Sequence, residues 1–259
     1  MRPISDHAGF TLIEMIIVIA ITAIVGSMVA LFLRAPLESY VAQDRRARLA
    51  DAADTALRRM GRDIRLALPN SVRVTAAGSV VEFLGTRSGG RYRAQGGGDI
   101  LDFTAADNSF DVLGPAIDDM RTSDRIAVYN LGIPGADAWA GETLADYVGA
   151  VGSVTTIAIA PTQFPLDSPG NRFQVVDGPV SYVCDLGART LTRFWGYDPT
   201  VGVTAATPRA LLANQVSACN FTYQPGITER GGLVSMTLSL TQAGETVSLY
   251  ATTQVSNQP

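Results

Sequence analysis

A long apolar run near the start of the chain constrains the fold more than any other feature. Residues 10–33 contain a single ionisable side chain, that of Glu14, among hydrophobic or small uncharged residues. As a helix rising 1.5 Å per residue, the run would reach about 36 Å, which is enough to cross a hydrocarbon layer roughly 30 Å thick. An ionisable group inside such a segment is costly and usually functional. We therefore expect a membrane-spanning helix in which Glu14 has a specific role.

A short polar leader, residues 1–9, precedes the run and ends at Gly9. A secretory signal peptide has a similar order, but its apolar core is only about 7–15 residues long and it is cut beyond that core. An uncleaved membrane anchor explains the length of the run, but it explains neither the carboxylate of Glu14 nor the Gly9–Phe10 junction. A carboxylate that merely reaches the lipid headgroups is a further alternative for Glu14.

The stretch Gly9 to Glu14, Gly-Phe-Thr-Leu-Ile-Glu, together with the apolar run resembles the leader of type IV prepilins and type II secretion pseudopilins. The resemblance implies that a prepilin peptidase cuts between Gly9 and Phe10 and methylates the new amino terminus of Phe10. It also implies that Glu14 pairs with the N-terminal amine of a neighbouring subunit, because opposite charges attract strongly at low dielectric. The implied partners are other major and minor pilins, the peptidase, the inner-membrane assembly platform and membrane lipid.

Helical patterning continues beyond the apolar run. Pro36 removes a backbone donor, so we expect a kink there rather than an end. Apolar residues then recur every three or four positions and predict one buried stripe: Leu49, Ala53, Ala56, Leu57, Met60, Ile64 and Ala67. The charged residues between them predict a solvated face or, alternatively, a contact with neighbouring subunits. The helix is expected to end near Ala67, before Leu68-Pro69-Asn70.

The rest of the chain is typical of β-structure, because short β-branched or aromatic segments alternate with turn residues. Loops are expected at 85–98 and 132–152, which are rich in glycine. Gln242-Ala243-Gly244-Glu245 predicts a hairpin turn. The expected strands are 72–74, 80–84, 100–104, 110–113, 126–131, 154–160, 172–176, 180–184, 190–197, 216–223, 233–241 and 246–255.

Cys184 and Cys219 are the only cysteines, and both are far from the membrane segment. An even number of cysteines in an exported head favours a disulfide, with two buried free thiols as the alternative. From residue 69 onward the chain has 11 Arg against 17 Asp and Glu, a net charge of −6. Because nucleic-acid binding requires clustered cations, no nucleic-acid partner is expected.

The sequence contains no nucleophile-elbow Gly-x-Ser-x-Gly, no Walker loop and no Cys-x-x-Cys. Its only histidine is His7, inside the leader, so no histidine chemistry is expected in the mature chain. We predict neither an enzyme nor a cofactor, and no metal site. Five residues could supply oxygen ligands to calcium: Asp99, Asp102, Asp107, Asn108 and Asp111. Their spacing is not that of an EF-hand, and side chains of solvated turns are the better interpretation. An aromatic group, Phe194, Trp195 and Tyr197, could bind carbohydrate, although sheet packing is its usual role.

Three C-terminal segments, 173–184, 191–197 and 247–257, resemble the MshO family of minor pilin-like proteins of mannose-sensitive haemagglutinin (MSHA) pili. That resemblance implies a subunit at or near the filament tip that acts in pilus assembly or priming. It also implies a single-pass protein of the inner membrane with a periplasmic head, which later enters the pilus fibre or its tip. The alternatives are a J-type minor pseudopilin of type II secretion and a membrane-anchored periplasmic binding protein.

We therefore predict an α+β, type IV pilin-like fold, in which a long N-terminal helix packs on an antiparallel β-rich head. The expected divisions are a cleaved leader at 1–9, a transmembrane or filament-core helix at 10–35, an amphipathic helix at 36–68 and the head at 69–259.

Overall fold

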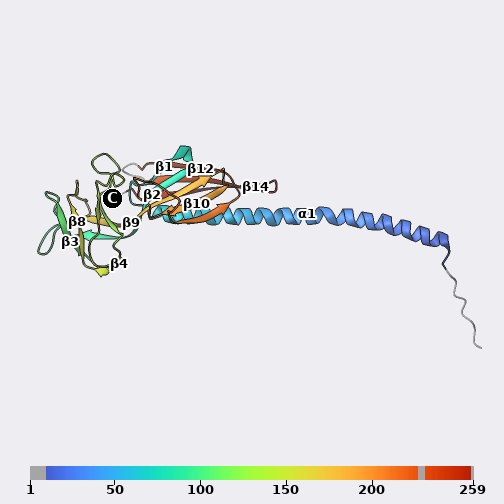
Figure 1. Ribbon diagram of the computed structural model, residues 1–259, viewed down its shortest axis with the longest axis horizontal. Helices are drawn as coiled ribbons and strands as arrows, with labels where there is room; N and C mark the ends of the chain where they lie inside the picture. The colour runs from blue at the N-terminus through green and yellow to red at the C-terminus, as the bar shows by residue number, and fades with distance from the viewer. Residues whose placement is uncertain (1–9, 227–230, 258–259) are drawn as a thin grey trace, which may run out of the picture. The chain divides into compact units, whose positions relative to one another are not determined.

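A computed structural model describes residues 10–226 and 231–257 of the chain. The chain divides into two units, residues 1–48 and 49–259, and each is described by itself below. The fold is α+β, with one long N-terminal helix followed by an antiparallel, β-rich head (Figure 1). Fold class and strand orientation therefore agree with the sequence-based prediction.

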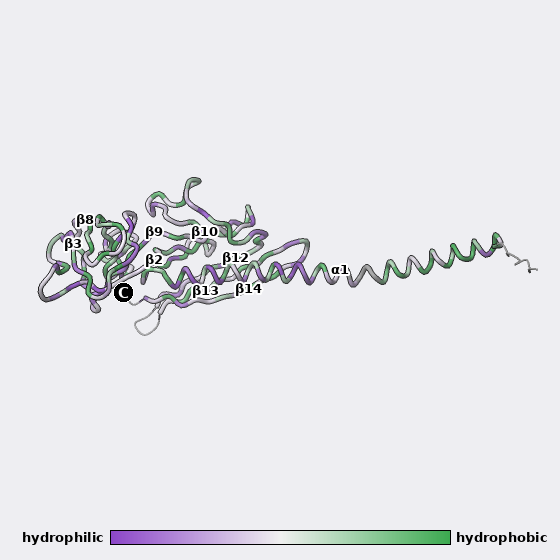
Figure 2. Tube along the Cα trace, turned by 90° about the horizontal axis from the view of Figure 1, so that it is seen from below, coloured by the Kyte–Doolittle hydropathy of each residue, from purple (hydrophilic) through white to green (hydrophobic). Residues whose placement is uncertain are grey.

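The helix α1 runs from Leu12 to Arg65 and continues through Pro36. Its first part, Leu12–Phe32, is apolar and long enough to cross a membrane, and none of its residues is buried. Figure 2 shows this part as predominantly hydrophobic, whereas the later turns of α1 mix hydrophobic and hydrophilic residues. The helix α1 ends at Arg65, two residues before the expected end near Ala67, and the chain then turns.

In the second unit, the predicted apolar stripe of α1 is buried against strands of the head. Met60 and Ile64 are completely buried, since the three- and four-residue spacing places them on the face that meets the sheets. Burying each large aliphatic side chain contributes about 1.5–3 kcal/mol, so this stripe is a major part of the attachment of the helix. All seven predicted stripe positions are buried: Leu49, Ala53, Ala56, Leu57, Met60, Ile64 and Ala67.

The described part of the head contains three antiparallel sheets. The largest has nine strands: six follow the order β11-β10-β9-β2-β3-β8, and β1, β5 and β6 are attached to this path. The second sheet has the order β12-β13-β14. In the third sheet, β4 pairs with β7. The bounds are β1 Arg73–Thr75, β2 Val80–Tyr92, β3 Asp107–Leu113, β4 Ile117–Met120, β5 Arg125–Val128, β6 Leu144–Asp146, β7 Gly152–Val154, β8 Thr156–Thr162, β9 Arg172–Asp185, β10 Thr190–Trp195, β11 Arg209–Asn214, β12 Val216–Gln224, β13 Gly232–Gln242 and β14 Glu245–Val255, with a short 3-10 helix η1 at Ala76–Gly78.

Several sequence-based boundaries were wrong. The predicted glycine-rich loop at 85–98 is in large part strand, because β2 continues to Tyr92 alongside β9, with bulges near Thr86 that absorb the poor strand formers. The strands predicted at 172–176 and 180–184 form one strand, β9, because it pairs with β2 from Arg172 to Val183. Residues 100–104 form no strand, and the predicted loop at 132–152 includes β6.

The strands β4, β7 and β11 were not predicted, since none of them has a strong β-branched pattern. In contrast, the hairpin between β13 and β14 is confirmed. Gln242 pairs with Glu245, and Ala243 and Gly244 both have positive φ, as a two-residue turn of the I′ type requires.

The head is built around two main cores. The first joins the C-terminal half of α1 to β2, β9, β10, β12 and β13 and includes Phe83, Tyr182 and Phe221. The second lies among β3, β4, β5, β8 and β9, and Phe110 and Phe173 meet there edge to face with ring centroids 5.2 Å apart. A smaller cluster around Leu68 and Val176 is also buried.

Candidate functional site

The first turn of α1 contains two of the residues singled out in the sequence. Phe10 is 78% exposed and precedes the helix. Thr11 caps the helix, because its Oγ1 accepts a hydrogen bond of 3.3 Å from the backbone N–H of Glu14. The Thr-x-x-Glu spacing is that of a capping box, and it holds the acidic residue in the first turn, where the helix dipole favours negative charge. Gly9 lies outside the described residues.

The apolar part of α1 satisfies its own polar groups. The hydroxyl of Ser27 donates to the carbonyl of Ile24 at 2.7 Å, and that of Thr22 donates to Val18. A helix whose hydrogen bonds are all internal is suited to lipid, where no water can replace a missing partner. The carboxylate of Glu14 is the exception, because its side chain has no partner within residues 10–226 and 231–257. It is the one charged group of the span Leu12–Phe32.

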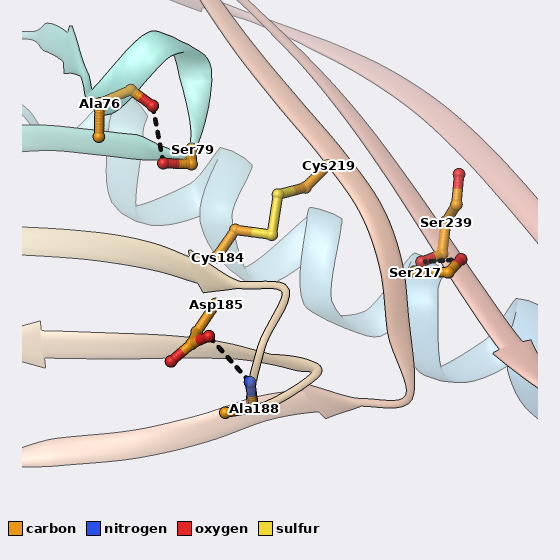
Figure 3. The surroundings of a disulfide bond; sticks show 8 residues. All are labelled: Ala76, Ser79, Cys184, Asp185, Ala188, Ser217, Cys219 and Ser239. Carbon is orange, nitrogen blue, oxygen red and sulfur yellow. Dashed lines mark hydrogen bonds between the residues drawn. A yellow bond between two sulfur atoms is a disulfide. The ribbon is translucent and has the colours of Figure 1, made fainter.

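The two cysteines form a disulfide in the other unit, 49–259. Cys184 at the end of β9 is bonded to Cys219 in β12, with their Cα atoms 6.6 Å apart (Figure 3). The bond links the nine-stranded sheet to the three-stranded sheet, and within residues 10–226 and 231–257 no strand of one pairs with a strand of the other. Cys184 is also held by its N–H, which donates to the carbonyl of Ser79 at 2.9 Å. The disulfide is thus a covalent tie between the two layers that cover α1.

A polar cluster that sequence reasoning missed joins α1 to β9 and β10. Both the Tyr182 hydroxyl and the Arg193 Nε donate to Asp63 Oδ2 at 2.7 Å. Arg59 lies 3.3 Å from the other oxygen of Asp63. The side chains of Asp63 and Arg193 are each only 17% exposed. Burial, and next the hydrogen bond to Asp63, raise the pKa of the Tyr182 phenol well above its usual value.

Asp63 corrects one interpretation of the charged helix face. In the sequence it looks like any other member of the charge run between residues 45 and 65, whose members were expected to face solvent or neighbouring subunits. The structure instead places it against the chain's own sheet. Its position one residue before the buried Ile64 is the only local signal, and that signal does not identify Tyr182 or Arg193 as its partners.

A second carboxylate, that of Glu82 in β2, organises the residues around β9. It accepts hydrogen bonds from Arg73 Nε at 2.9 Å and from the hydroxyls of Ser181 and Tyr197 at 3.0 Å each. Burial raises the pKa of Tyr197, and Glu82 contributes to the rise. Tyr197 is thus a buried structural residue. Phe194 and Trp195 are only partly exposed, so these three aromatic residues do not form the open surface on which a sugar could stack.

The acidic residues considered for calcium are used by the turns around β3. Asp111 Oδ2 accepts from the backbone N–H of Asp99 at 3.1 Å and from Arg93, and Asp107 Oδ2 accepts from the N–H of Asp102 at 2.8 Å. Hydrogen bonding, above all from the backbone of Asp99, lowers the pKa of Asp111. Within residues 10–226 and 231–257, no group of three or more His, Cys, Asp or Glu side chains could hold a metal ion.

Residues 4–30 match the prokaryotic N-terminal methylation motif, which covers Gly9, Phe10, Glu14 and most of the apolar part of α1. No curated protein and no solved structure matches the chain. The motif and the apolar helix together support a type IV pilin-like protein that is anchored in a membrane and carries a soluble head. The motif also implies processing by a prepilin peptidase and assembly with other pilins, and it suggests a structural subunit rather than an enzyme.

Proposed function

We propose that the chain is a minor pilin-like subunit of a type IV pilus of the MSHA type. A prepilin peptidase cuts it between Gly9 and Phe10 and methylates Phe10, and the mature subunit acts in assembly or priming at or near the filament tip. The observation that carries the proposal is the methylation motif over an apolar helix whose one carboxylate, Glu14, has no partner within the described chain.

The proposal assigns a task to each part of the chain. Residues 1–9 are the leader, 10–35 anchor the subunit in the inner membrane and later enter the filament core, 36–68 attach the anchor to the head, and 69–259 form a periplasmic head. The continuous course of α1 supports this division, because a single helix carries both the apolar and the amphipathic part.

Glu14 drives the transfer from membrane to filament in this scheme. In lipid its charge is poorly solvated, which raises the free energy of the isolated subunit. Cleavage creates a positive secondary amine on Phe10. The Glu14 carboxylate of an incoming subunit meets this amine on a subunit already assembled, and the pairing relieves the cost of the buried charge.

The N-terminus of the exported protein tests the processing step. Intact mass and N-terminal sequencing of the chain recovered from membranes and sheared filaments should show N-methylated Phe10 as the first residue. An intact Met1 would contradict the proposal and favour an uncleaved anchor, and a cut after residue 25 would favour a secreted binding protein. Crosslinking to co-assembled subunits separates an MSHA-type pilus from a type II secretion pseudopilus.

A further inference from the structure

The strand β14 is an open sheet edge of unusual length. It pairs with β13 over all 11 of its residues without a bulge, and no strand of the described ranges pairs with its other side. Such an edge is a template for another chain, so proteins normally interrupt it with proline, charged residues or bulges. Between Thr246 and Val255, β14 has none of these.

The other long outer strands of the two larger sheets are interrupted, and the outer strands β1 and β6 have only three residues each. The pairing of β12 with β13 shifts between Val216 and Ala218, and the pairing of β10 with β11 shifts near Leu191. β8 contains Pro161, and its register with β3 also shifts. Among the outer strands of these two sheets in the described ranges, β14 therefore combines length with an uninterrupted edge.

A groove of about 390 Å³ runs between β14 and one flank of α1. Its floor on the strand side includes Leu249 and Ala251, which α1 covers only in part. The helix side contributes Asp54 and three cations, which follow one another along the flank as Arg58, Arg62 and Arg65.

The helix flank has an excess of positive charge. Arg58 pairs with Asp54 at 2.6 Å, and Arg65 Nε donates to the Thr253 hydroxyl at 3.2 Å. Arg62 is exposed and makes no hydrogen bond or ion pair with any residue of the described ranges. The groove therefore offers one unused cation, with two more beside it.

The spacing of these groups is somewhat shorter than the side-chain repeat of an added strand, and the long arginine side chains can span the difference. A strand next to β14 would lie about 4.8 Å away from it, and every second side chain would point toward the helix side at intervals of roughly 6.7 Å. The arginines follow one another by three or four residues, which is about 4.5–6 Å along the helix axis. Acidic side chains on such a strand would meet the arginines, while its backbone would pair with the free edge of β14.

We propose that the edge of β14 binds an extended acidic segment of a partner protein, which adds a strand to the sheet and sets its carboxylates against Arg58, Arg62 and Arg65. Main-chain hydrogen bonds supply the attachment, and the arginines select the charge of the partner. The surface lies wholly within unit 49–259 and does not depend on cleavage at Gly9 or on the role of Glu14.

The test uses the full chain in detergent micelles with a short, end-blocked peptide of alternating threonine and glutamate as the probe. We expect the peptide to slow amide hydrogen exchange within residues 245–255 by about tenfold or more. Arg62→Glu should weaken binding of this peptide by about tenfold and strengthen binding of a threonine–lysine peptide, since attraction becomes repulsion. Arg209→Glu, an exposed cation in β11, is the matched control and should change neither affinity by more than about twofold.

Backbone pairing and charge are tested separately. An acidic peptide with N-methyl groups at alternate amides should lose binding, because it cannot donate to the strand edge. Equal binding by that peptide, or protection elsewhere in the head, would overturn the proposal. Protection of β14 that rises with protein concentration in the absence of peptide, together with a dimer in sedimentation, would overturn it in favour of a second copy at this edge.

Discussion

At the scale of single residues, Glu14 combines a backbone N–H that is capped within the chain with a carboxylate that we propose to pair between subunits. Glu14 completes the Thr-x-x-Glu spacing that Thr11 begins, so its backbone N–H is satisfied by the chain itself. Its carboxylate has no partner in the described ranges and lies within the span that could cross a membrane. The local contact explains where the helix begins, and a carboxylate inside lipid is costly unless a cation neutralises it.

Replacing Glu14 tests that external role. Glu14→Ala and Glu14→Leu should retain membrane insertion and cleavage, because both keep or raise the hydrophobicity of the span. Both should abolish incorporation into filaments, since the pairing with the Phe10 amine is lost. Fractionation, processing state and the subunit content of sheared filaments measure the three steps. Glu38→Leu, which lies beyond the apolar span, is the control, and normal incorporation of a Glu14 variant would refute the role.

The disulfide is the second residue-scale feature that can be tested. Cys184 and Cys219 are 35 positions apart, and a crosslink over such a loop contributes about 3–4 kcal/mol in the chain-entropy model. Changing both cysteines to serine should lower the thermal midpoint of the head by several degrees, as followed by circular dichroism. Added reductant should destabilise the wild-type chain and leave the double variant unchanged. A reductant effect on the double variant would show that another process is responsible.

At the scale of elements, the amphipathic part of α1 is attached to the sheets by an apolar stripe and one polar cluster. The hydrophobic packing of the stripe is non-directional, so by itself it would tolerate small rotations of the helix. The hydrogen bonds from Tyr182 and Arg193 to Asp63 are directional, so they fix the rotation and the axial position of α1 against β9 and β10.

Asp63→Ala should therefore destabilise the head by about 2–3 kcal/mol, because it leaves a buried hydroxyl and a largely buried guanidinium without their acceptor. Asp63→Asn should cost less, since an amide oxygen still accepts one bond. Asp51→Ala on the exposed face of the same helix is the control, and it should change the free energy of unfolding by no more than about 0.5 kcal/mol. Denaturant unfolding curves measure both effects, and an equal effect at both positions would contradict the assignment.

At the scale of the whole molecule, the head depends on two separate hydrophobic cores, and only the first includes α1. The second core closes β3, β4, β5 and β8 around Phe110, Phe164 and Phe173. The strand β9 contributes to both, because its 14 residues extend from Phe173 in the second core to Tyr182 in the first. This shared strand explains how the head remains one unit in spite of its divided interior.

Buried tyrosines make the stability of this unit sensitive to alkaline pH. Burial raises the pKa of both Tyr182 and Tyr197 in the folded chain, whereas an unfolded tyrosine ionises near pH 10. The folded state therefore keeps its full stability below about pH 10 and loses it as the pH rises toward the folded pKa values. Each tyrosine should contribute a slope of about 1.4 kcal/mol per pH unit.

Denaturation curves between pH 8 and 11 should show this loss in the wild-type chain. The double variant Tyr182→Phe, Tyr197→Phe should have a flatter profile, even though its stability at neutral pH is lower because of the missing hydrogen bonds. Tyr250→Phe changes an exposed ring and serves as the control. An unchanged slope in the double variant would assign the alkaline loss to other groups.

The sequence alone determined the features that depend on local order along the chain. The long apolar run, the stripe from Leu49 to Ala67 and the two-residue hairpin turn at Ala243 could be predicted, because each requires only a regular spacing or a backbone preference. The methylation motif likewise lies in consecutive residues, so the candidate processing residues can be recognised without knowledge of the fold.

Only the tertiary structure decided which distant residues meet. The continuation of β2 through a glycine-rich segment depends on β9 beside it, which supplies the backbone partners that such a segment cannot obtain by propensity. Tyr182 and Arg193, which donate to Asp63, are more than 100 residues away from it in sequence, and the open edge of β14 exists because the sheet ends there. Contacts of this kind arise from packing between elements, and no periodicity within one element encodes them.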